Sequence, residues 1–326
     1  MARICLYYRP LDPDRWFKGD RHLRAWVRRL VRGKPRAGGI GRVFLNLCEG
    51  LRRIGAEFSV NPPFSQIMPD DQVVVLGIGR DVLLGYDRPN PIVAGIALLA
   101  QPADWPTLFE DYPVATYLQH SAWAADLYRP YFGDRCGVWP VGIDTGLWAP
   151  ADKPKSQDFV LYLKTDEVPQ ATQAALTSQV TSVLTNAGLT FSLIRYGHYR
   201  EEEYRAALSQ ARGMIFLSPH ESQGLACEEC LACDVPVLAW DPGITVERPA
   251  GYEPTVSTSV PYFDERCGVR FKSPEDFGEA LKSFIDGRDQ GRFAPRKFIL
   301  ESLTLEKAAS HMCAILDAAN RPNGAV

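Results

Sequence analysis

The fold of this chain is decided by residues 218–241, which read SPHESQGLACEECLACDVPVLAWD. The apolar run at 213–217 is typical of a buried strand that ends at this stretch. After a turn and a glycine-containing bend, residues 225–233 have the apolar spacing of a helix. Residues 236–240 form a second apolar run. The stretch therefore predicts a strand, a tight loop, a helix and another strand.

The loop before the predicted helix has the features of an anion site. The first N–H groups of a helix lack intrahelical partners, and the helix dipole is positive there, which suits a phosphate. Gly224 allows the backbone to approach a ligand closely. Glu229, further along the helix, can accept the paired hydroxyls of a ribose, while Glu221 would face whatever lies beyond the phosphates. The alternative is an ordinary strand–helix–strand unit with surface acids, but this order of groups favours a sugar-nucleotide site.

The same stretch resembles the E-x7-E signature of retaining glycosyltransferases with the GT-B fold, specifically those of family 4. The family wording is S-x-x-E-G-F-G-L-x-x-x-E-A-x-A-x-G-x-P-V. The matching residues in this chain are Ser218, Glu221, Gly224, Leu225, Glu229, Ala232, Pro236 and Val237. Two departures are that Ser222 and Gln223 replace Gly-Phe and that Asp234 replaces Gly.

A second motif, VWPVGIDTGLWAP at residues 138–150, resembles the segment that joins the two domains in this family, V-I-P-N-G-V-D-x-x-x-F-x-P. The resemblance implies two Rossmann-like, doubly wound α/β domains facing a cleft. We expect an N-terminal acceptor domain at 1–147 and a C-terminal nucleotide-sugar domain at 148–304. A final helix at about 305–326 is expected to cross back onto the first domain.

Composition agrees with a two-domain globular protein. The chain has 326 residues, of which 46% are hydrophobic and 23% charged. No apolar run reaches the length of a membrane helix, and the N-terminus lacks a signal-peptide pattern. The eight cysteines at irregular spacing fit a reducing compartment. These features predict a cytoplasmic protein without a nucleic-acid partner.

Basic charge is concentrated at residues 15–36, which contain nine Lys or Arg residues and one acid in a chain of net charge −3. Within this segment, apolar residues from Leu23 to Val31 fall at helical spacing, and arginines from Arg21 to Arg32 occupy the other face. Such a helix can pack its apolar stripe on the domain, contact an anionic membrane surface peripherally, or line an anionic acceptor cleft. The sequence leaves these three interpretations open.

The N-terminal half predicts strands at 3–8, 57–60, 72–76, 91–98 and 114–118, and helices at 42–54 and 122–131. The glycines at 38–41 precede the first helix and resemble the family's N-terminal loop, which implies that Gly39 and Gly41 border the donor phosphates and the acceptor. His120, at a strand end, and Asp104, in a loop, are further candidates. A hydrogen-bonded structural role is the alternative for His120.

The C-terminal half alternates strands at 159–163 and 190–196 with helices at 168–187 and 201–210, which predicts a parallel sheet. Ligands of such sheets lie at the carboxyl ends of strands, where Lys164 and Ser218 both lie. By the resemblance, Lys164 is the first of two basic residues that hold the donor diphosphate. Pro169 and Gln170 stand where the second lysine is expected. After Asp241 we expect an irregular loop, a helix at 274–285 and two further helices.

The sequence predicts neither a metal nor another cofactor. Cys227, Cys230 and Cys233 form C-x2-C-x2-C, but they lie inside a predicted helix without a fourth ligand at ferredoxin spacing. Cysteine at such positions behaves as a small hydrophobic residue. The D-x-D formed by Asp12 and Asp14 follows the first strand and is interpreted as a turn.

The resemblance implies a metal-independent, retaining hexosyltransferase that moves a sugar from a nucleoside diphosphate sugar to a glycan, lipid or small-molecule acceptor. Its expected catalytic residues are Glu221 and Lys164, and its expected donor-binding residues are Glu229, Ser222, Gln223, Gly224, Leu225, Gly39 and Gly41. The alternatives are a non-catalytic GT-B homologue that binds a nucleotide, sugar or partner, and a phosphorylase or epimerase on the same fold. The last two would need a cofactor-binding lysine or a different acid–base set.

Overall fold

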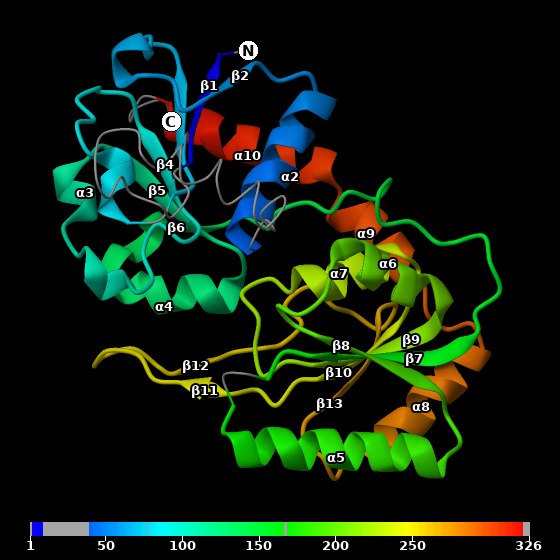
Figure 1. The fold of residues 1–326 in the computed structure, drawn as a ribbon. Helices are drawn as coiled ribbons and strands as arrows, with labels where there is room; N and C mark the ends of the chain where they lie inside the picture. Colours follow the sequence, from blue (N-terminus) through cyan, green and yellow to red (C-terminus); the bar gives the residue numbers. More distant parts are fainter. Residues whose placement is uncertain (1, 9–38, 78, 166–167, 322–326) are drawn as a thin grey trace, which may run out of the picture. The chain divides into compact units, whose positions relative to one another are not determined.

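Two separate parallel sheets organise the chain (Figure 1). The computed structural model describes residues 2–8, 39–77, 79–165 and 168–321. The chain divides into two compact units. Unit 1 comprises 1–119, 131–139 and 309–326, and unit 2 comprises 120–130 and 140–308.

Unit 1 contains a six-stranded sheet in the order β2-β1-β3-β4-β5-β6, with all neighbours parallel. Its strands are β1 (Ile4–Tyr7), β2 (Phe58–Val60), β3 (Gln72–Val75), β4 (Ile92–Gly95), β5 (Val114–Gln119) and β6 (Cys136–Val138). The four residues of β1 and of β3 are all buried, as expected for central strands of a sheet covered on both faces.

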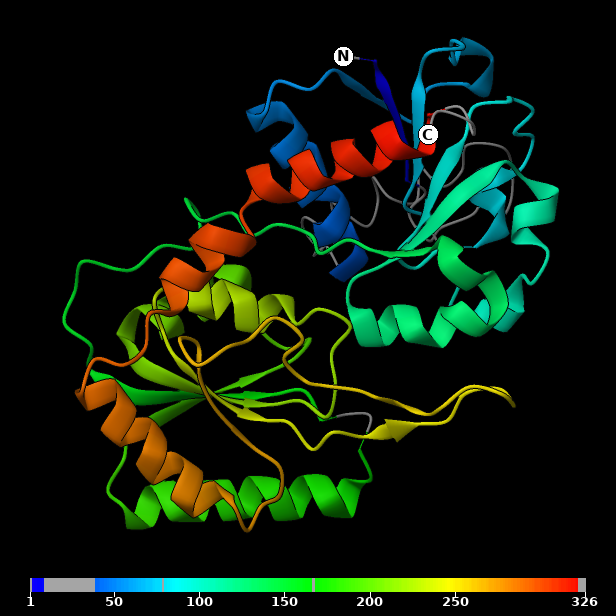
Figure 2. The ribbon, with the colours of Figure 1, turned by 180° about the vertical axis from the view of Figure 1, so that it is seen from behind.

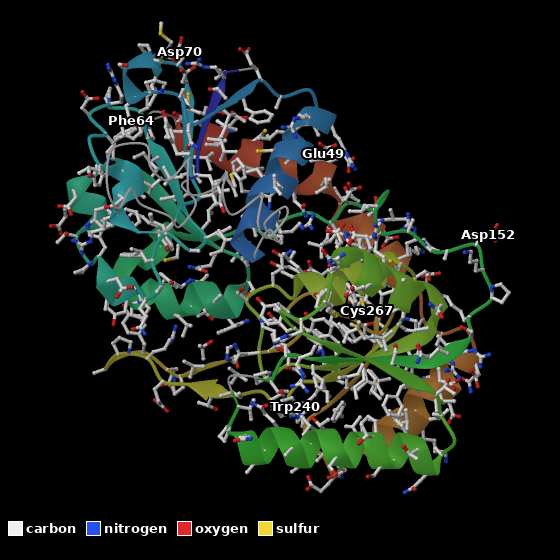
Figure 3. The ribbon with its side chains drawn as sticks, viewed as in Figure 1. Glu49, Phe64, Asp70, Asp152, Trp240 and Cys267 are labelled. Carbon is white, nitrogen blue, oxygen red and sulfur yellow. The ribbon has the colours of Figure 1, made fainter. Side chains whose placement is uncertain are left out.

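The helix at 39–53 in unit 1 buries one face. Helix α2 (Gly39–Arg53) buries Val43, Leu47 and Leu51, whereas Glu49 on its exposed side pairs with two arginines (Figure 3). The unit also contains α3 (Leu108–Asp111), the short helices η1 (Phe64–Gln66), η2 (Arg80–Leu83), η3 (Pro102–Asp104) and η4 (Gly133–Arg135), and most of α10 (Leu305–Ala319). The Gln72 amide donates to Asp317 at 2.8 Å, which holds the end of α10 beside β3.

Unit 2 contains a five-stranded parallel sheet in the order β13-β10-β9-β7-β8. Its strands are β7 (Gln157–Leu163), β8 (Phe191–Arg195), β9 (Ala211–Leu217), β10 (Val237–Trp240) and β13 (Gly268–Phe271). The central strands β7, β9 and β10 are almost entirely buried. This explains why they read as continuous apolar runs in the sequence rather than as alternating patterns.

The helices of unit 2 cover both faces of this sheet. Successive residues of a strand point to opposite faces, so each strand contributes side chains to two cores. Tyr162 and Phe216 pack in one core with α6 (Glu201–Gln210), α7 (Leu225–Ala232) and α9 (Pro295–Ser302). Phe159 and Leu161 pack in the other core with α5 (Gln170–Asn186) and α8 (Phe277–Asp289). Unit 2 is therefore doubly wound.

The domain limits expected from the sequence differ from these units at three places. Residues 120–130, which include most of α4 (Ala122–Phe132), group with unit 2. The His120 carbonyl accepts from Tyr262 and the Asp126 carbonyl accepts from Arg248 of that unit. Residues 140–147 also group with unit 2, since the Ile143 amide donates to the Leu303 carbonyl. The expected final helix starts in unit 2 and joins unit 1 from residue 309.

Two expected elements have different limits because of their backbone conformation. The strand expected at 91–98 ends at Gly95, since Ile96 and Ala97 have φ values of +45° and +68°, which are incompatible with a strand. The helix expected at 42–54 already begins at Gly39. Gly39 and Gly41 therefore lie within the first turn of α2, and not in a loop before it.

The segment after Asp241 contains more regular structure than the irregular loop expected there. A two-stranded antiparallel hairpin, β11 (Thr245–Val246) and β12 (Thr255–Val256), precedes β13 and extends beyond the sheet of its unit (Figures 1 and 2). The helix expected at 274–285 is α8, which begins three residues later. The sequence did not predict strand β13, because Gly268 and Arg270 interrupt its short apolar pattern.

No helix in the described part of the chain is both long enough and apolar enough to cross a membrane. The amphipathic helix predicted within 15–36 and the turn predicted at 12–14 lie outside the described residues.

Candidate functional site

The candidate site of unit 2 starts where β7 and β9 end. Leu163 and Leu217 are register partners, and the Lys164 amide donates to the Leu217 carbonyl at 2.9 Å. Lys164 and Ser218 therefore leave the sheet side by side at its carboxyl edge. This is the edge at which parallel α/β sheets bind ligands.

Lys164 and Glu221 form an ion pair at this edge, with 2.6 Å between Nζ and Oε2. The Ser218 hydroxyl donates to the other carboxylate oxygen, Oε1, at 3.0 Å. The Lys164 and Glu221 side chains are 24% and 12% exposed, and the ammonium also lies 5.0 Å from the centre of the Tyr196 ring. Both carboxylate oxygens of Glu221 are thus held by donors, in a place that an incoming ligand can still reach.

The backbone around Glu221 is fixed by residues far away in the sequence. The Glu221 amide donates to the Thr258 carbonyl at 2.9 Å, and the Trp123 indole Nε1 donates to the Glu221 carbonyl at 3.0 Å. The Trp123 ring also contacts the His220 ring edge-on, with 5.9 Å between centroids. The sequence did not predict a role for Trp123, because nothing local links this residue to Glu221.

The turn that leads into α7 depends on a glycine. Gly224 has φ +90°, a conformation that L side chains rarely adopt, and it directly precedes the first residue of the helix. Ser222 is exposed in this turn and Leu225 is half-buried, whereas the Gln223 side chain is buried at 3% exposure. The amides of 222–224 stay the predicted ligand donors, but the Gln223 side chain points into the protein and binds other residues of unit 2.

Glu229 lies in α7 at 9% exposure, near two tyrosines. The hydroxyls of Tyr162 and Tyr199 are 3.2 Å apart. Burial raises the pKa of Tyr199 to about 12, and the negative charges of Glu229 and Glu221 add to this shift. Neither tyrosine was predicted from the sequence, although Tyr162 directly precedes the end of β7. Glu221, Lys164 and Glu229 thus share one region of unit 2 with this pair.

The remaining candidates have other surroundings. Gly39, Gly41 and Asp104 belong to unit 1. The Asp104 carboxylate accepts from the Gln101 amide at 2.9 Å and so caps the short helix η3, which accounts for this residue locally. His120 is buried in unit 2, and its carbonyl accepts from the Tyr262 hydroxyl. The predicted ligand contacts of these residues stay predictions.

The cysteine triplet lies in the core. Cys227, Cys230 and Cys233 are buried in and just after α7, and Cys267 (labelled in Figure 3) packs in the same cluster. Burial raises the pKa of each of these thiols, that of Cys267 to about 12. Among the described residues, no three His, Cys, Asp or Glu side chains are arranged to hold a metal ion.

Asp234, where the family wording has glycine, ends α7 with φ +58°. Asp tolerates this left-handed conformation better than most residues, and its carboxylate accepts from the Arg296 amide at 3.3 Å. The departure from the motif therefore preserves the helix end.

The sequence matches no protein-family model and no curated protein. The structure is similar to several solved glycosyltransferases. A glycosyltransferase from Rickettsia africae ESF-5 aligns with a TM-score of 0.57 and 10% identity over 99% of this chain and 100% of that one. A sucrose-phosphate synthase from Thermosynechococcus elongatus aligns with a TM-score of 0.52 and 13% identity over 98% and 99%.

The pneumococcal O-GlcNAc transferase GtfA, in a complex with UDP and GlcNAc, aligns with a TM-score of 0.51 and 12% identity over 76% of this chain. The aligned part is 57% of the GtfA chain, so this chain spans little more than half of that protein's length. At these identities the comparisons establish the fold. The chain has the GT-B fold, and its fold class agrees with the one predicted from the two motifs.

Proposed function

We propose that the protein is a metal-independent, retaining glycosyltransferase that uses a nucleoside diphosphate sugar. The observation that carries the proposal is the grouping of Lys164, Glu221 and Ser218 at the carboxyl edge of the sheet, directly before the start of α7. The UDP and GlcNAc in the GtfA complex add support, since that protein shares the fold. A glycan, lipid or small molecule would accept the sugar.

Each group at this edge would act on a different part of the donor. Lys164 and the first amides of α7 would stabilise the departing diphosphate, whose negative charge grows as the bond to the sugar breaks. Glu221 would accept hydrogen bonds from the donor sugar, and Glu229 would accept those of the ribose hydroxyls. Because the Lys164 ammonium and the first amides of α7 are in place before the reaction, no metal is needed in this scheme.

The ion pair between Lys164 and Glu221 is compatible with these separate roles of the two residues. Without a ligand, each charge stabilises the other at a site that is only partly exposed. A diphosphate brings more negative charge than one carboxylate, so it would draw the ammonium away and free Glu221 for the sugar. The proposed acceptor attack on the leaving-group face, which gives retention, rests on the family resemblance alone.

Binding of the donor nucleotide tests this proposal. We would record the melting temperature with UDP, GDP, ADP and TDP, each with and without a chelator, for the wild type and for Glu229→Ala and Lys164→Met. A nucleotide present at a hundred times its dissociation constant adds about 2.7 kcal/mol to the free energy of unfolding. We expect one nucleotide to raise the wild-type melting temperature by several degrees without metal, and both variants to lose most of that rise.

Glu202→Ala is the matched control, because Glu202 is exposed in α6 of the same unit. It should respond to the nucleotide as the wild type does. If none of the four nucleotides stabilises the wild type, or if stabilisation needs a divalent metal, the proposal is wrong.

A second candidate is a GT-B protein that binds a nucleotide or sugar without turnover. The absence of a second lysine, with Pro169 and Gln170 in its place, favours this alternative. Slow hydrolysis of the nucleotide sugar by the purified protein would separate the two: a transferase is expected to release nucleoside diphosphate at a measurable rate that Lys164→Met lowers. Tight nucleotide binding with no release would support the binding protein.

A further inference from the structure

The turn before α7 is held by a buried polar contact that connects distant parts of unit 2. The Gln223 side-chain oxygen accepts from the Val141 amide at 2.9 Å, and its nitrogen donates to the Val141 carbonyl at 2.7 Å. The two contacts copy the pairing of adjacent backbone strands. Residues 221–224, here called the site loop, are therefore attached through one amide side chain to a segment 82 residues earlier.

The Val141 segment is itself firmly fixed. The next residue but one, Ile143, donates to the Leu303 carbonyl and pairs with Thr304. A Cβ atom at Gly142 would lie 2.4 Å from the Thr304 carbonyl oxygen, so the two backbones approach more closely than any side chain permits. The segment can therefore act as a rigid support for Gln223.

Glu228 completes the hydrogen bonding of Gln223. The Gln223 nitrogen uses its second hydrogen to donate to Glu228 Oε2 at 2.8 Å. Gln223 stands where the motif has phenylalanine, and a buried amide in an apolar position is costly unless its donors are satisfied. With Val141 and Glu228 as partners, both hydrogens and the oxygen of the amide are used.

The Glu228 carboxyl is in an environment that favours its neutral form. It is 1% exposed, and among the described residues its second oxygen, Oε1, has no hydrogen-bond partner. Burial raises the pKa of Glu228 well above its ordinary value, and the hydrogen bond from Gln223 opposes this rise. The Glu229 and Glu221 carboxylates raise it further. The Tyr262 phenol and the Cys227 thiol also lie near Glu228, and the pKa of each is raised by burial and by Glu228.

We propose that Glu228 is a positioning residue, which keeps the Gln223 side chain on Val141 and thereby holds the site loop in its donor-binding conformation. The role in donor binding rests on the proposed function. The contacts among Glu228, Gln223 and Val141 do not depend on that function. Glu228 is too buried to touch a substrate. Its effect would pass through Gln223 to Glu221 and to the amides of Ser222 and Gly224.

The exchange of the Val141 amide hydrogen with solvent reports on this contact directly, since its partner is the Gln223 side chain. The Ile143 amide, bonded to the Leu303 backbone, is a control in the same segment. We would measure both amides at single-residue resolution in the wild type, Glu228→Met and Glu228→Gln. Met is of similar length but cannot accept the hydrogen bond, whereas Gln can.

We expect Val141 to exchange about tenfold faster in Glu228→Met, with Ile143 unchanged, and both amides to keep wild-type rates in Glu228→Gln. In the same proteins, the dissociation constant for the most stabilising nucleotide among UDP, GDP, ADP and TDP should rise about tenfold in Glu228→Met and stay within about twofold in Glu228→Gln. A merely structural acid would weaken both amides together and leave the nucleotide affinity of the folded protein unchanged.

Unchanged exchange at Val141 in Glu228→Met would overturn the proposal, and so would faster exchange there without any loss of nucleotide affinity. Should Glu228→Met fail to fold, Gln223→Met tests the same contact from its other end, with the same expected results. If the wild type binds none of the nucleotides, the proposed function fails and the donor-binding role of Glu228 fails with it. The Val141 rates then still show whether Glu228 holds Gln223.

Discussion

At the scale of single residues, Glu221 and Glu228 have the same carboxyl group in very different surroundings. Glu221 is partly exposed and holds an ammonium and a hydroxyl, whereas Glu228 is fully enclosed and receives one hydrogen bond from a neutral amide. An ammonium partner stabilises the charged form of a carboxyl, and an enclosed apolar site disfavours it. The two acids are therefore suited to different tasks, Glu221 to ligand contact and Glu228 to support.

The raised pKa of Glu228 predicts a pH dependence of stability. In the unfolded chain this acid ionises near its ordinary pKa of 4.5, but in the folded protein it keeps its proton to a higher pH. Between the pKa of Glu228 in the unfolded chain and its raised pKa in the folded protein, the folded state binds more protons than the unfolded state. The free energy of unfolding therefore falls as pH rises, by at most about 1.4 kcal/mol per pH unit for one group. Glu228→Gln removes this contribution.

We therefore expect the melting temperature of Glu228→Gln, relative to that of the wild type, to increase from pH 5 to pH 8. Thermal unfolding in a series of buffers measures this difference. Glu202→Gln, an exposed glutamate in α6, should follow the wild type over the whole range. Parallel curves for Glu228→Gln and the wild type would show that Glu228 is already ionised in the folded protein.

At the scale of elements, the site depends on connections between segments and less on the segments themselves. The site loop is short, yet its backbone is held by Trp123 at the start of α4 and by Thr258 after the β11–β12 hairpin. Its one buried side chain rests on Val141. Changes in any of these three supports should reach Glu221.

Gly142 tests the support behind Val141. Gly142→Ala would place a methyl group 2.4 Å from the Thr304 carbonyl oxygen, against backbone that cannot rotate away. We expect a loss of about 1–3 kcal/mol in the free energy of unfolding, as for other overpacked sites, together with weaker nucleotide binding. Denaturant unfolding and nucleotide titration measure the two effects.

Gly278→Ala is the matched control, because a Cβ atom there meets nothing within 4 Å and its position in α8 suits alanine. It should be neutral or stabilising by up to about 1 kcal/mol. A Gly142→Ala variant as stable as this control would mean that the 142 and 304 backbones separate at little cost.

At the scale of the whole molecule, the distribution of charge separates residues 15–36 from the rest of the chain. Nine basic residues lie within these 22 positions, although the chain as a whole has a net charge of −3. Of the three interpretations of the segment, contact with an anionic membrane is the one that makes a measurable claim for the intact protein. A polybasic amphipathic helix gains about 1 kcal/mol per basic residue near an anionic surface.

Under that interpretation, the full chain should float with vesicles of phosphatidylglycerol and phosphatidylcholine, and less so as salt rises. Neutralisation of Arg21, Arg24, Arg28 and Arg32 to Gln should abolish most of this binding. The control replaces four exposed basic residues elsewhere, namely Arg212, Lys282, Lys297 and Arg321. Flotation that persists after the first set of changes, or fails equally after the second, would contradict the membrane interpretation.

The sequence by itself determined the local elements and their class. Continuous apolar runs at β7 and β9, the left-handed glycine before α7 and the helical spacing after it are properties of neighbouring residues, so periodicity and turn chemistry reveal them. The two motifs indicated the GT-B fold, and the family resemblance predicts that Lys164 and Glu229 bind the same donor. The limits of α2 and β4 were wrong and β13 was not predicted at all, because short or glycine-rich patterns are ambiguous.

Only the tertiary structure decided which groups meet. Lys164 reaches Glu221 because β7 and β9 are adjacent in the sheet, and strand order is not written in the pattern of either strand. Gln223 contacts Val141 because folding brings together two segments that are 82 residues apart in the sequence. A buried amide and a buried acid look like surface residues in the sequence, and what makes them compatible with the core is a set of hydrogen bonds that exists only in the folded chain.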